Sequence, residues 1–217
     1  MKINIYFFIS LLIVNIFLQI GCQTKPVKTV ELGNKIDISK LPKFYWETKA
    51  QIRDLKRKKN NNVSIDFLAI KNAKIRLDIK ATLGVQVGTL GISQEQFIAV
   101  LYRQKNVIQG KMDEKVLTKA FNLPIPPEAL YSIAFDESIK GLQWKCNYDS
   151  LRVVSLCENE KQQSRVEWSN RVGGGKLVKI FSPTIEVDWF FKPPQVLETN
   201  EETFKVEIPN GYKITTI

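Results

Sequence analysis

The amino-acid sequence predicts a mainly β fold of about eleven antiparallel strands, with a short helical insertion after the sixth. Two observations support this prediction. Short segments of alternating apolar and polar side chains recur along the chain, and turn signals separate them at regular short intervals. The alternation is replaced only over residues 113–135, where the apolar residues take a helical spacing. So many strands from one chain are expected to curl into a closed or partly open barrel.

The first six predicted strands form a meander with one apolar face. Residues 74–81 show it most clearly, because Ile75, Leu77 and Ile79 alternate with charged side chains. In an antiparallel sheet this alternation buries one face and leaves the other, here rich in Lys and Arg, in water. The six segments are residues 48–56, 63–70, 74–81, 85–92, 96–102 and 106–112.

The helical insertion has two parts. An apolar stripe with helical spacing ends at Phe121. A second short helix opens at a Pro-Pro pair and turns Leu130 and Ile133 inward. Strands then resume at residues 142–148, 151–158, 164–170, 176–182 and 184–191, followed by the C-terminal segments TFKVEI and YKITTI.

Residues 1–21 have the layout of a secretory signal peptide, with Lys2, an apolar run and a small residue before the cut. The glycine before Cys22 makes the junction resemble the bacterial lipoprotein processing box, in which the cysteine is acylated and becomes the first mature residue. The alternative is an uncleaved N-terminal anchor. Residues 22–43 are polar, contain two prolines and lack periodicity, which predicts a tether from the lipid to a domain at residues 44–217.

The sequence contains no histidine. This removes Ser-His-Asp and Cys-His catalysis, together with the commonest zinc ligand. Acidic residues such as Glu186 and Asp188 lie at two-residue spacing in strand-like sequence, which is typical of a solvated outer face. We therefore expect no enzyme, no metal site and no cofactor.

The charge of the chain is strongly basic. Its 32 basic and 22 acidic residues give a net charge of +10, and removal of Lys2 with the signal peptide leaves +9. This balance suits an anionic membrane surface or an acidic partner, whereas an exported protein without a nucleic-acid motif is not expected to bind nucleic acid. The basic run LKRKKNNN, residues 55–62, lies between two predicted strands. Its position favours a solvated hairpin tip, and the alternative is a membrane-surface patch.

Cys146 and Cys157 can form a disulfide if the chain is exported, because the compartment is then oxidising. The strand register leaves the pairing open. A two-residue turn at Asp149-Ser150 would separate the cysteines by roughly 13 Å along the strands. A longer loop centred near Leu151-Arg152 would place them opposite each other.

The loop Ala-Thr-Leu-Gly, residues 81–84, joins two strands but lacks the Asn, Asp or Ser that usually accompanies glycine in a hairpin loop. Gly84 lets the chain turn, so Leu83 is expected to project outward at the tip. The alternative is that Leu83 packs onto a neighbouring loop, since single exposed leucines are ordinary.

Three motifs in order resemble the LolA/LolB-like superfamily, bacterial proteins that carry lipoproteins across the periplasm and place them in the outer membrane. RLDIKATLG (76–84) is similar to the family's R-L-x-L-x-x-P-L-G segment, with Thr82 in place of the proline. LPIPPEAL (123–130) resembles its P-I-P-x-x-L segment, and QWKCNY (143–148) resembles its W-x-V-x-Y strand. The likeness is strongest to the membrane-anchored receptor branch, LolB, although the ending TFKVEIPNGYKI is more similar to the soluble carrier branch.

The resemblance implies an open, half-closed antiparallel barrel covered by helices, with an apolar cavity between sheet and helices. The large apolar inward faces of the predicted strands require the same arrangement if the barrel is open, and they would then accept acyl chains. The alternative is ordinary core packing. The expected cavity residues are Ile65, Phe67, Ile75, Leu77, Ile79, Val87, Phe97, Leu130, Ile133, Trp144 and Trp189.

The resemblance also implies a function and a place in the cell. In the LolB branch the leucine before the glycine projects to help insert cargo into the membrane, and Leu83 and Gly84 occupy those places. The expected protein is a monomeric outer-membrane lipoprotein on the periplasmic side, which receives acylated lipoproteins from a LolA-like carrier and helps insert them into the outer membrane. The alternative is a lipid-anchored binding or structural lipoprotein that uses the same fold for another lipid or for assembly of an envelope complex.

Overall fold

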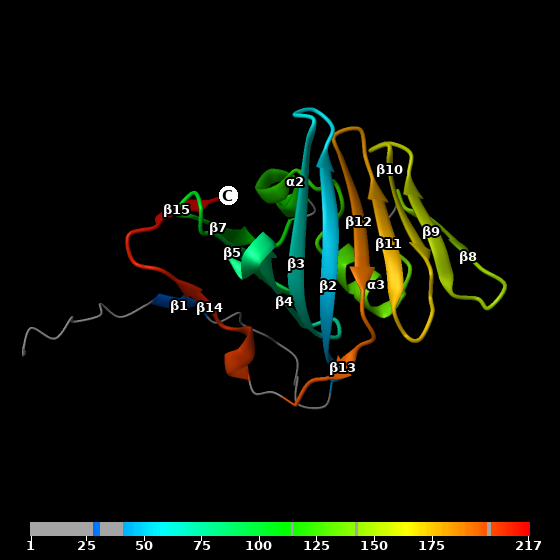
Figure 1. Ribbon diagram of the computed structural model, residues 1–217, viewed down its shortest axis with the longest axis horizontal. Helices are drawn as coiled ribbons and strands as arrows, with labels where there is room; N and C mark the ends of the chain where they lie inside the picture. Colours follow the sequence, from blue (N-terminus) through cyan, green and yellow to red (C-terminus); the bar gives the residue numbers. More distant parts are fainter. Residues whose placement is uncertain (1–27, 31–40, 114, 142, 199–200) are drawn as a thin grey trace, which may run out of the picture.

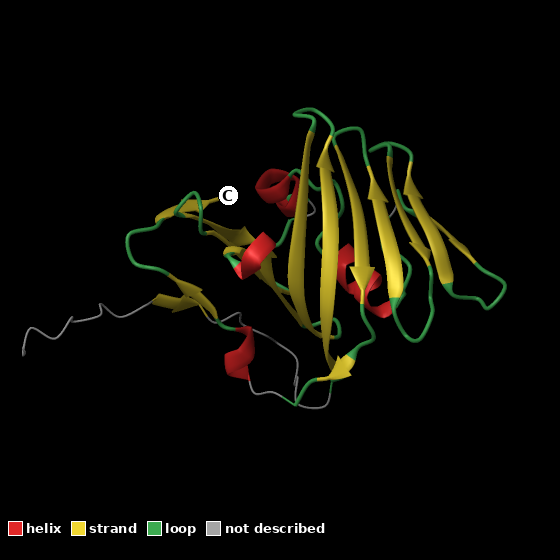
Figure 2. Ribbon diagram, in the orientation of Figure 1, coloured by secondary structure: helices red, strands yellow, loops and turns green. Residues whose placement is uncertain are grey.

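The computed structural model of the chain describes residues 28–30, 41–113, 115–141, 143–198 and 201–217. The predicted fold class is confirmed: one long, open sheet curls partly around two short helices (Figures 1 and 2). The predicted signal peptide and Cys22 lie outside the described residues.

The strands of the first half are β1 (Lys28–Val30), β2 (Lys43–Asp54), β3 (Lys59–Ile70), β4 (Lys74–Ala81), β5 (Gln86–Ser93), β6 (Gln96–Leu101) and β7 (Asn106–Lys111). Those of the second half are β8 (Lys145–Tyr148), β9 (Val154–Asn159), β10 (Ser164–Ser169), β11 (Lys176–Phe181), β12 (Ile185–Phe191), β13 (Gln195–Val196), β14 (Val206–Ile208) and β15 (Lys213–Thr216). Helices α2 (Val116–Phe121) and α3 (Ala129–Phe135) lie between β7 and β8, as the sequence predicts. Two short 3₁₀ turns, η2 (Thr82–Gly84) and η3 (Glu201–Phe204), complete the described elements.

The sheet is two antiparallel meanders joined side by side. Its order is β15-β7-β6-β5-β4-β3-β2-β12-β11-β10-β9-β8, so the eleven strands from β2 to β12 correspond to the predicted eleven. The joint is the pairing of β2 with β12, in which Ile52 lies opposite Val187 and Ala50 opposite Trp189. The ends of this path do not pair with each other within the described residues, which leaves the barrel open.

The sequence underestimates the hairpin of β2 and β3. Both strands are twelve residues long and pair without interruption from Lys43 opposite Ile70 to Asp54 opposite Lys59. The segment Asn60–Asn62 has low strand propensity, which hides the beginning of β3 in the sequence. Pairing with β2, which is itself held by β12, keeps this segment extended.

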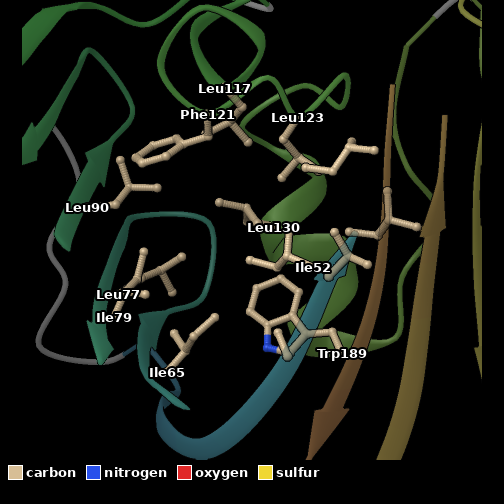
Figure 3. A pocket seen from close by; sticks show the side chains of 14 residues that line it. Ile52, Ile65, Leu77, Ile79, Leu90, Leu117, Phe121, Leu123, Leu130 and Trp189 are labelled. Carbon is tan, nitrogen blue, oxygen red and sulfur yellow. The ribbon is translucent and has the colours of Figure 1, made fainter. Parts of the chain in front are cut away.

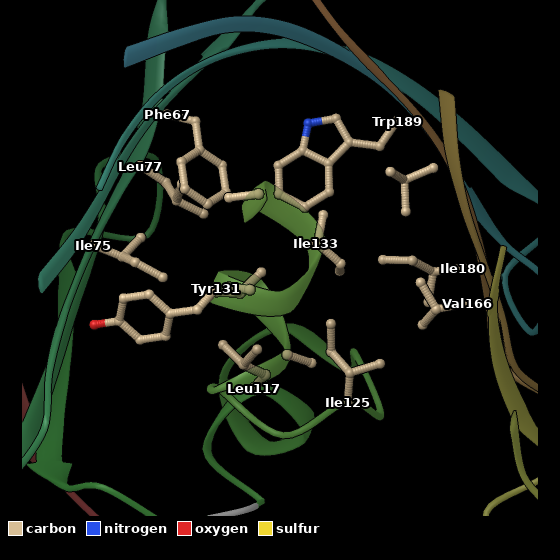
Figure 4. Packing of buried hydrophobic residues seen from close by; sticks show 14 of the residues in the cluster. Phe67, Ile75, Leu77, Leu117, Ile125, Tyr131, Ile133, Val166, Ile180 and Trp189 are labelled. Carbon is tan, nitrogen blue, oxygen red and sulfur yellow. The ribbon is translucent and has the colours of Figure 1, made fainter. Parts of the chain in front are cut away.

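The concave face of the sheet and the two helices share one hydrophobic core (Figure 4). Phe67 lies near its centre, with its ring 5.6 Å from Trp46, 5.7 Å from Trp189 and 5.9 Å from Phe191. These tilted and edge-on contacts are the arrangements that aromatic rings prefer. All residues of α3 from Ala129 to Ala134 are buried, so this helix fills the concave side rather than resting on its surface.

The C-terminal segment covers part of the convex face, which the sequence assigns to solvent. Val206 and Ile208 of β14 pack against Ile98, Val100 and Val107 of β6 and β7 in a separate buried cluster. Strand β14 pairs with β1, which lies inside the segment predicted to be the tether. Strand β15 adds to the edge of the sheet parallel to β7.

The two cysteines of the domain form a disulfide. Cys146 of β8 lies directly opposite Cys157 of β9, joined by a loop in which the amides of Leu151 and Val153 donate hydrogen bonds to the Asp149 carboxylate. Of the two registers that the sequence leaves open, the longer loop is the one present. The disulfide holds the edge strand β8 to the sheet.

Candidate functional site

An apolar cavity of about 170 Å³ lies between the concave face of the sheet and the helices (Figure 3). All of the side chains that line it are hydrophobic, and they come from both meanders and from the helical insertion. The lining residues are Ala50, Ile52, Ile65, Leu77, Ile79, Leu90, Leu117, Phe121, Leu123, Leu130, Ile180, Ile185, Val187 and Trp189.

The polar atom of the one tryptophan in the lining is satisfied away from the cavity. Trp189 Nε1 donates a hydrogen bond of 2.8 Å to Thr48 Oγ1, and Thr48 Oγ1 donates one of 2.9 Å to the carbonyl oxygen of Ile65. A buried polar group without a partner costs free energy. These two hydrogen bonds satisfy the indole N–H and the Thr48 hydroxyl, so the ring of Trp189 can line an apolar cavity without that cost. The cavity therefore offers its occupant carbon surfaces without a directed polar contact.

Helix α3 is fixed to the sheet by a buried amine. Lys176 Nζ donates a 2.7 Å hydrogen bond to the carbonyl oxygen of Ala134 and lies 3.1 Å from Asp136 Oδ1. The pKa of Lys176 is lowered from its ordinary value because the amine is buried, and the Asp136 carboxylate offsets only part of this shift. Arg171 also pairs with Asp136, at 3.5 Å. The C-terminal end of α3 is thus held by two cations from the second meander.

Helix α2 lacks such anchors. Its only ion pair in the described part of the chain is local, between Lys119 and Asp113, at 3.3 Å. Its contribution to the cavity is hydrophobic, through Leu117 and Phe121, and Leu123 follows directly after the helix. Among the described residues, α3 forms ion pairs to the second meander and α2 forms none to the sheet.

The mouth of the cavity lies at one end of the sheet. Most lining residues are buried, but Ile52, Ile79, Phe121 and Leu123 are partly exposed. Ile79 lies two residues before the end of β4, and Ile52 lies two residues before the end of β2. The cavity therefore opens toward the loops that follow β2 and β4.

Five of the eleven residues predicted for the cavity line it: Ile65, Leu77, Ile79, Leu130 and Trp189. Four others are buried in the core and do not reach it: Phe67, Ile75, Phe97 and Ile133. They face the concave core, as the sequence predicts, but they are buried in it without lining the cavity. The alternation along a strand predicts which face of the sheet a residue is on. It does not predict whether the residue lines a cavity or lies in the packed core.

Val87 and Trp144 are also outside the cavity. The inward residues of β5 are Gly88, Leu90 and Ile92, since Gly88 pairs with Ile79 and Leu90 with Leu77. Val87 therefore belongs to the opposite face, beside Thr89, and its prediction is wrong. A register shift between Ile79 and Lys80 places Val87 in a bulge. Trp144 is partly buried at the side of the core, before β8.

Nine lining residues are not among those that the sequence predicts for the cavity. Those on the strands are Ala50, Ile52, Leu90, Ile180, Ile185 and Val187, and those of the insertion are Leu117, Phe121 and Leu123. Most of them lie at alternating positions of strands that the sequence predicts, so the alternation is enough to predict that they face inward. What was missing is the pairing of β2 with β12, which brings the two meanders to one cavity.

The loop after β4 exposes a leucine. Leu83 is 96% exposed, which excludes the alternative that it packs onto a neighbouring loop. Its φ is 69° and that of Gly84 is 76°, so two successive residues take the left-handed conformation. This conformation is unfavourable for leucine, whereas glycine adopts it freely. The loop follows Ala81, which pairs with Val63 and hence lies at the mouth end of the sheet.

No cluster of three or more His, Cys, Asp or Glu side chains that could hold a metal ion occurs among the described residues. Within the same residues, no helix is both long enough and apolar enough to cross a membrane.

No protein-family model matches the chain, and no curated protein matches its sequence. Among solved structures, the chain is similar to a LolA superfamily protein from Nitrosomonas europaea, with a TM-score of 0.48, 6% identity and coverage of 76% of this chain and 90% of that one. A candidate outer membrane lipoprotein-sorting protein domain from Vibrio parahaemolyticus gives a TM-score of 0.47 and 7% identity over 75% of this chain and 89% of the other.

A DUF1329 family protein from Desulfovibrio piger gives a TM-score of 0.43 and 8% identity over 77% of this chain and 91% of the other. The identities are 6–8% and the three TM-scores lie below 0.5.

Proposed function

We propose that the protein binds acyl chains in the apolar cavity and passes them to a membrane, as a lipid-anchored receptor similar to LolB. The observation that carries this proposal is a cavity lined by hydrophobic side chains alone, with its mouth beside a loop that exposes Leu83. Binding an acyl chain requires no catalytic group, which agrees with a sequence that contains no histidine. The three motifs that resemble the superfamily support the same function.

The size of the cavity implies a moving lid. An apolar cavity of roughly 150 Å³ in another protein holds one benzene molecule. A cavity of about 170 Å³ therefore accommodates a short segment of an acyl chain. To admit a whole chain, α2 moves outward, because its hold on the sheet is hydrophobic while α3 is held by Lys176 and Arg171.

The exposed loop serves release. The side chain of Leu83 is exposed and does not pack in the core. Burial of a leucine side chain in lipid gains on the order of 1.5–3 kcal/mol. This is too little to anchor a protein but enough to bias a transfer step that is close to balance. In the complete proposal, acylated Cys22 holds the protein on the periplasmic side of the outer membrane, a LolA-like carrier delivers a lipoprotein, and Leu83 opens the bilayer to its acyl chains.

A displacement assay tests the cavity. Residues 23–217 are expected to bind an apolar fluorescent probe that palmitate displaces. Leu77→Glu places a charge among the lining residues, so we expect lost binding and lowered stability. Ala50→Phe fills the cavity with apolar atoms, so we expect weakened binding without the cost of a buried charge. Val87→Glu introduces the same charge on the opposite face and is the matched control.

Normal probe binding by both Leu77→Glu and Ala50→Phe would refute the cavity as the acyl-chain site. Depletion of the protein in its own cell then tests the transfer role. The proposal requires other lipoproteins to accumulate away from the outer membrane. If they remain correctly placed although the cavity binds acyl chains, the alternative of a lipid-binding or structural lipoprotein is favoured.

A further inference from the structure

The tip of the β2–β3 hairpin, defined as Leu55–Lys59, carries an isolated cluster of positive charge. All five residues are exposed. Arg57 Nε lies 3.9 Å from Asp54 Oδ2, and this is the one ion pair of the tip among the described residues. Lys56, Lys58 and Lys59 form no ion pair within the described part of the chain, so their charges are available to an external partner.

The hairpin projects past its neighbour on one side. Strand β4 ends at Ala81 opposite Val63, so the four residues from Lys59 to Asn62 have no partner on that side of β3. At about 3.3 Å per residue, this overhang is roughly 13 Å long. Figure 1 shows the hairpin reaching beyond the adjacent strands. A surface that approaches this end of the sheet therefore contacts the tip before it contacts the end of β4.

The tip stands beside the mouth of the cavity. Lys59 pairs with Asp54, which in turn pairs with the lining residue Ile185. The turn η2, which carries Leu83, contacts β3 at the same end of the sheet. The basic tip, the mouth and the exposed leucine therefore share one end of the molecule.

We propose that the Leu55–Lys59 tip is a docking element for an anionic bilayer surface, which sets the mouth of the cavity and Leu83 against the membrane. This inference rests on the proposed function, because it assigns the orientation in which the cavity would deliver acyl chains. A bilayer fits better than an acidic protein, because the cations stand on a projecting tip with an exposed leucine at their base rather than in a concave surface. Anionic headgroups attract flexible lysines in this arrangement, and the attraction is confined to about one Debye length.

Each basic residue near an anionic leaflet strengthens the association about fivefold. The three unpaired lysines together are therefore expected to contribute about a hundredfold. A lipid anchor alone holds the protein on the membrane without orienting it. The tip supplies the orientation, and salt weakens it because its charges are exposed.

Lysine reactivity measures the contact directly. The full chain, extracted from membranes, is reconstituted into nanodiscs of phosphatidylcholine alone or of phosphatidylcholine mixed with phosphatidylglycerol. An amine-reactive label is applied, and modification is measured by peptide mass spectrometry. We expect labelling of Lys56, Lys58 and Lys59 to fall about fivefold in the anionic discs and to recover at high salt. Lys49 and Lys140, which are exposed elsewhere, are the internal controls.

Equal labelling of the tip in neutral and anionic discs would overturn the proposal, and so would equal protection of the control lysines. The first of these results is also expected if the tip binds an acidic protein. A chain that fails to bind acyl chains but shows salt-sensitive protection of the tip would refute the proposed function and leave the docking element standing.

A transfer experiment links the tip to delivery. Replacing Lys56, Lys58 and Lys59 by Gln is expected to slow acyl-chain transfer to anionic acceptor vesicles and to leave transfer to neutral vesicles unchanged. Replacing Lys49, Lys140 and Lys192 by Gln removes the same charge from other parts of the surface and should change neither rate. An unchanged rate for the tip variant with anionic vesicles would refute a role of the tip in delivery.

Discussion

Leu83→Asn is expected to make the protein more stable and less active. Leu83 is 96% exposed, so its replacement removes no packing. It holds a φ of 69°, a conformation that costs an ordinary residue about 1–2 kcal/mol and that asparagine tolerates much better. We therefore expect a gain of about 1 kcal/mol in the free energy of unfolding, which raises the melting temperature by roughly 2–4 °C in a domain of this size.

The same substitution removes the side chain that would enter the bilayer. Loss of about 1.5–3 kcal/mol of leucine burial corresponds to a decrease of roughly 10- to 100-fold in the rate of a transfer step that depends on insertion. Thermal unfolding and transfer of a lipidated cargo to liposomes, measured on the same preparation, test both effects. Probe binding in the cavity is expected to stay unchanged, because Leu83 does not line it.

Leu151→Asn is the matched control. Leu151 is 80% exposed in the β8–β9 loop, which lies at the opposite end of the sheet from the mouth. Its replacement should leave the transfer rate unchanged. The reasoning is refuted if Leu83→Asn transfers cargo at the original rate, if it lowers the melting temperature substantially, or if both variants slow transfer equally.

Three further predictions concern the N-terminus, the helix anchor and the disulfide. Mass spectrometry of the membrane-extracted protein should find acylated Cys22 as the first residue, and a chain that begins with Met1 would contradict this. Lys176→Met should lower stability by about 1–3 kcal/mol and increase amide exchange in α3, because the Ala134 carbonyl loses its buried donor and Asp136 loses one of its cations. Unchanged exchange would show that packing alone holds α3. Replacing Cys146 and Cys157 by Ser should lower stability by about 2–3 kcal/mol yet preserve probe binding, because the disulfide holds edge strand β8 away from the cavity. Lost binding would contradict it.

The meander and the helical insertion could be predicted because they depend on local pattern. Ile75, Leu77 and Ile79 alternate with charged residues, and the structure turns all three to the concave face. The insertion changes period from two to 3.6 residues, and α2 and α3 occupy it. Both signals arise from neighbours in the chain, which is why one sequence is enough to read them.

The composition of the cavity could not be predicted, because it depends on contacts between distant segments. Trp189 lines the cavity, while Phe67, an inward residue of β3, lies in the core, where its ring contacts other aromatic rings that come from β2 and β12. The alternation of β5 points to the wrong face for Val87, because the inward position before Leu90 is a glycine, Gly88, which carries no apolar side chain. Strand β14 covers part of the convex face, and only the folded chain brings it there.

Leu83 and the Leu55–Lys59 tip are two surface features that lower the stability of the folded protein. A leucine that is exposed and left-handed costs stability twice. The lysines of the projecting tip, which form no ion pair with any described residue, repel one another. A protein selected for stability alone would replace Leu83 by Asn or Gly and intersperse acidic residues among the lysines. Both features lie at the end of the sheet where the apolar cavity opens. Each becomes favourable in contact with one partner, since an anionic bilayer offers apolar chains to the leucine and negative headgroups to the lysines.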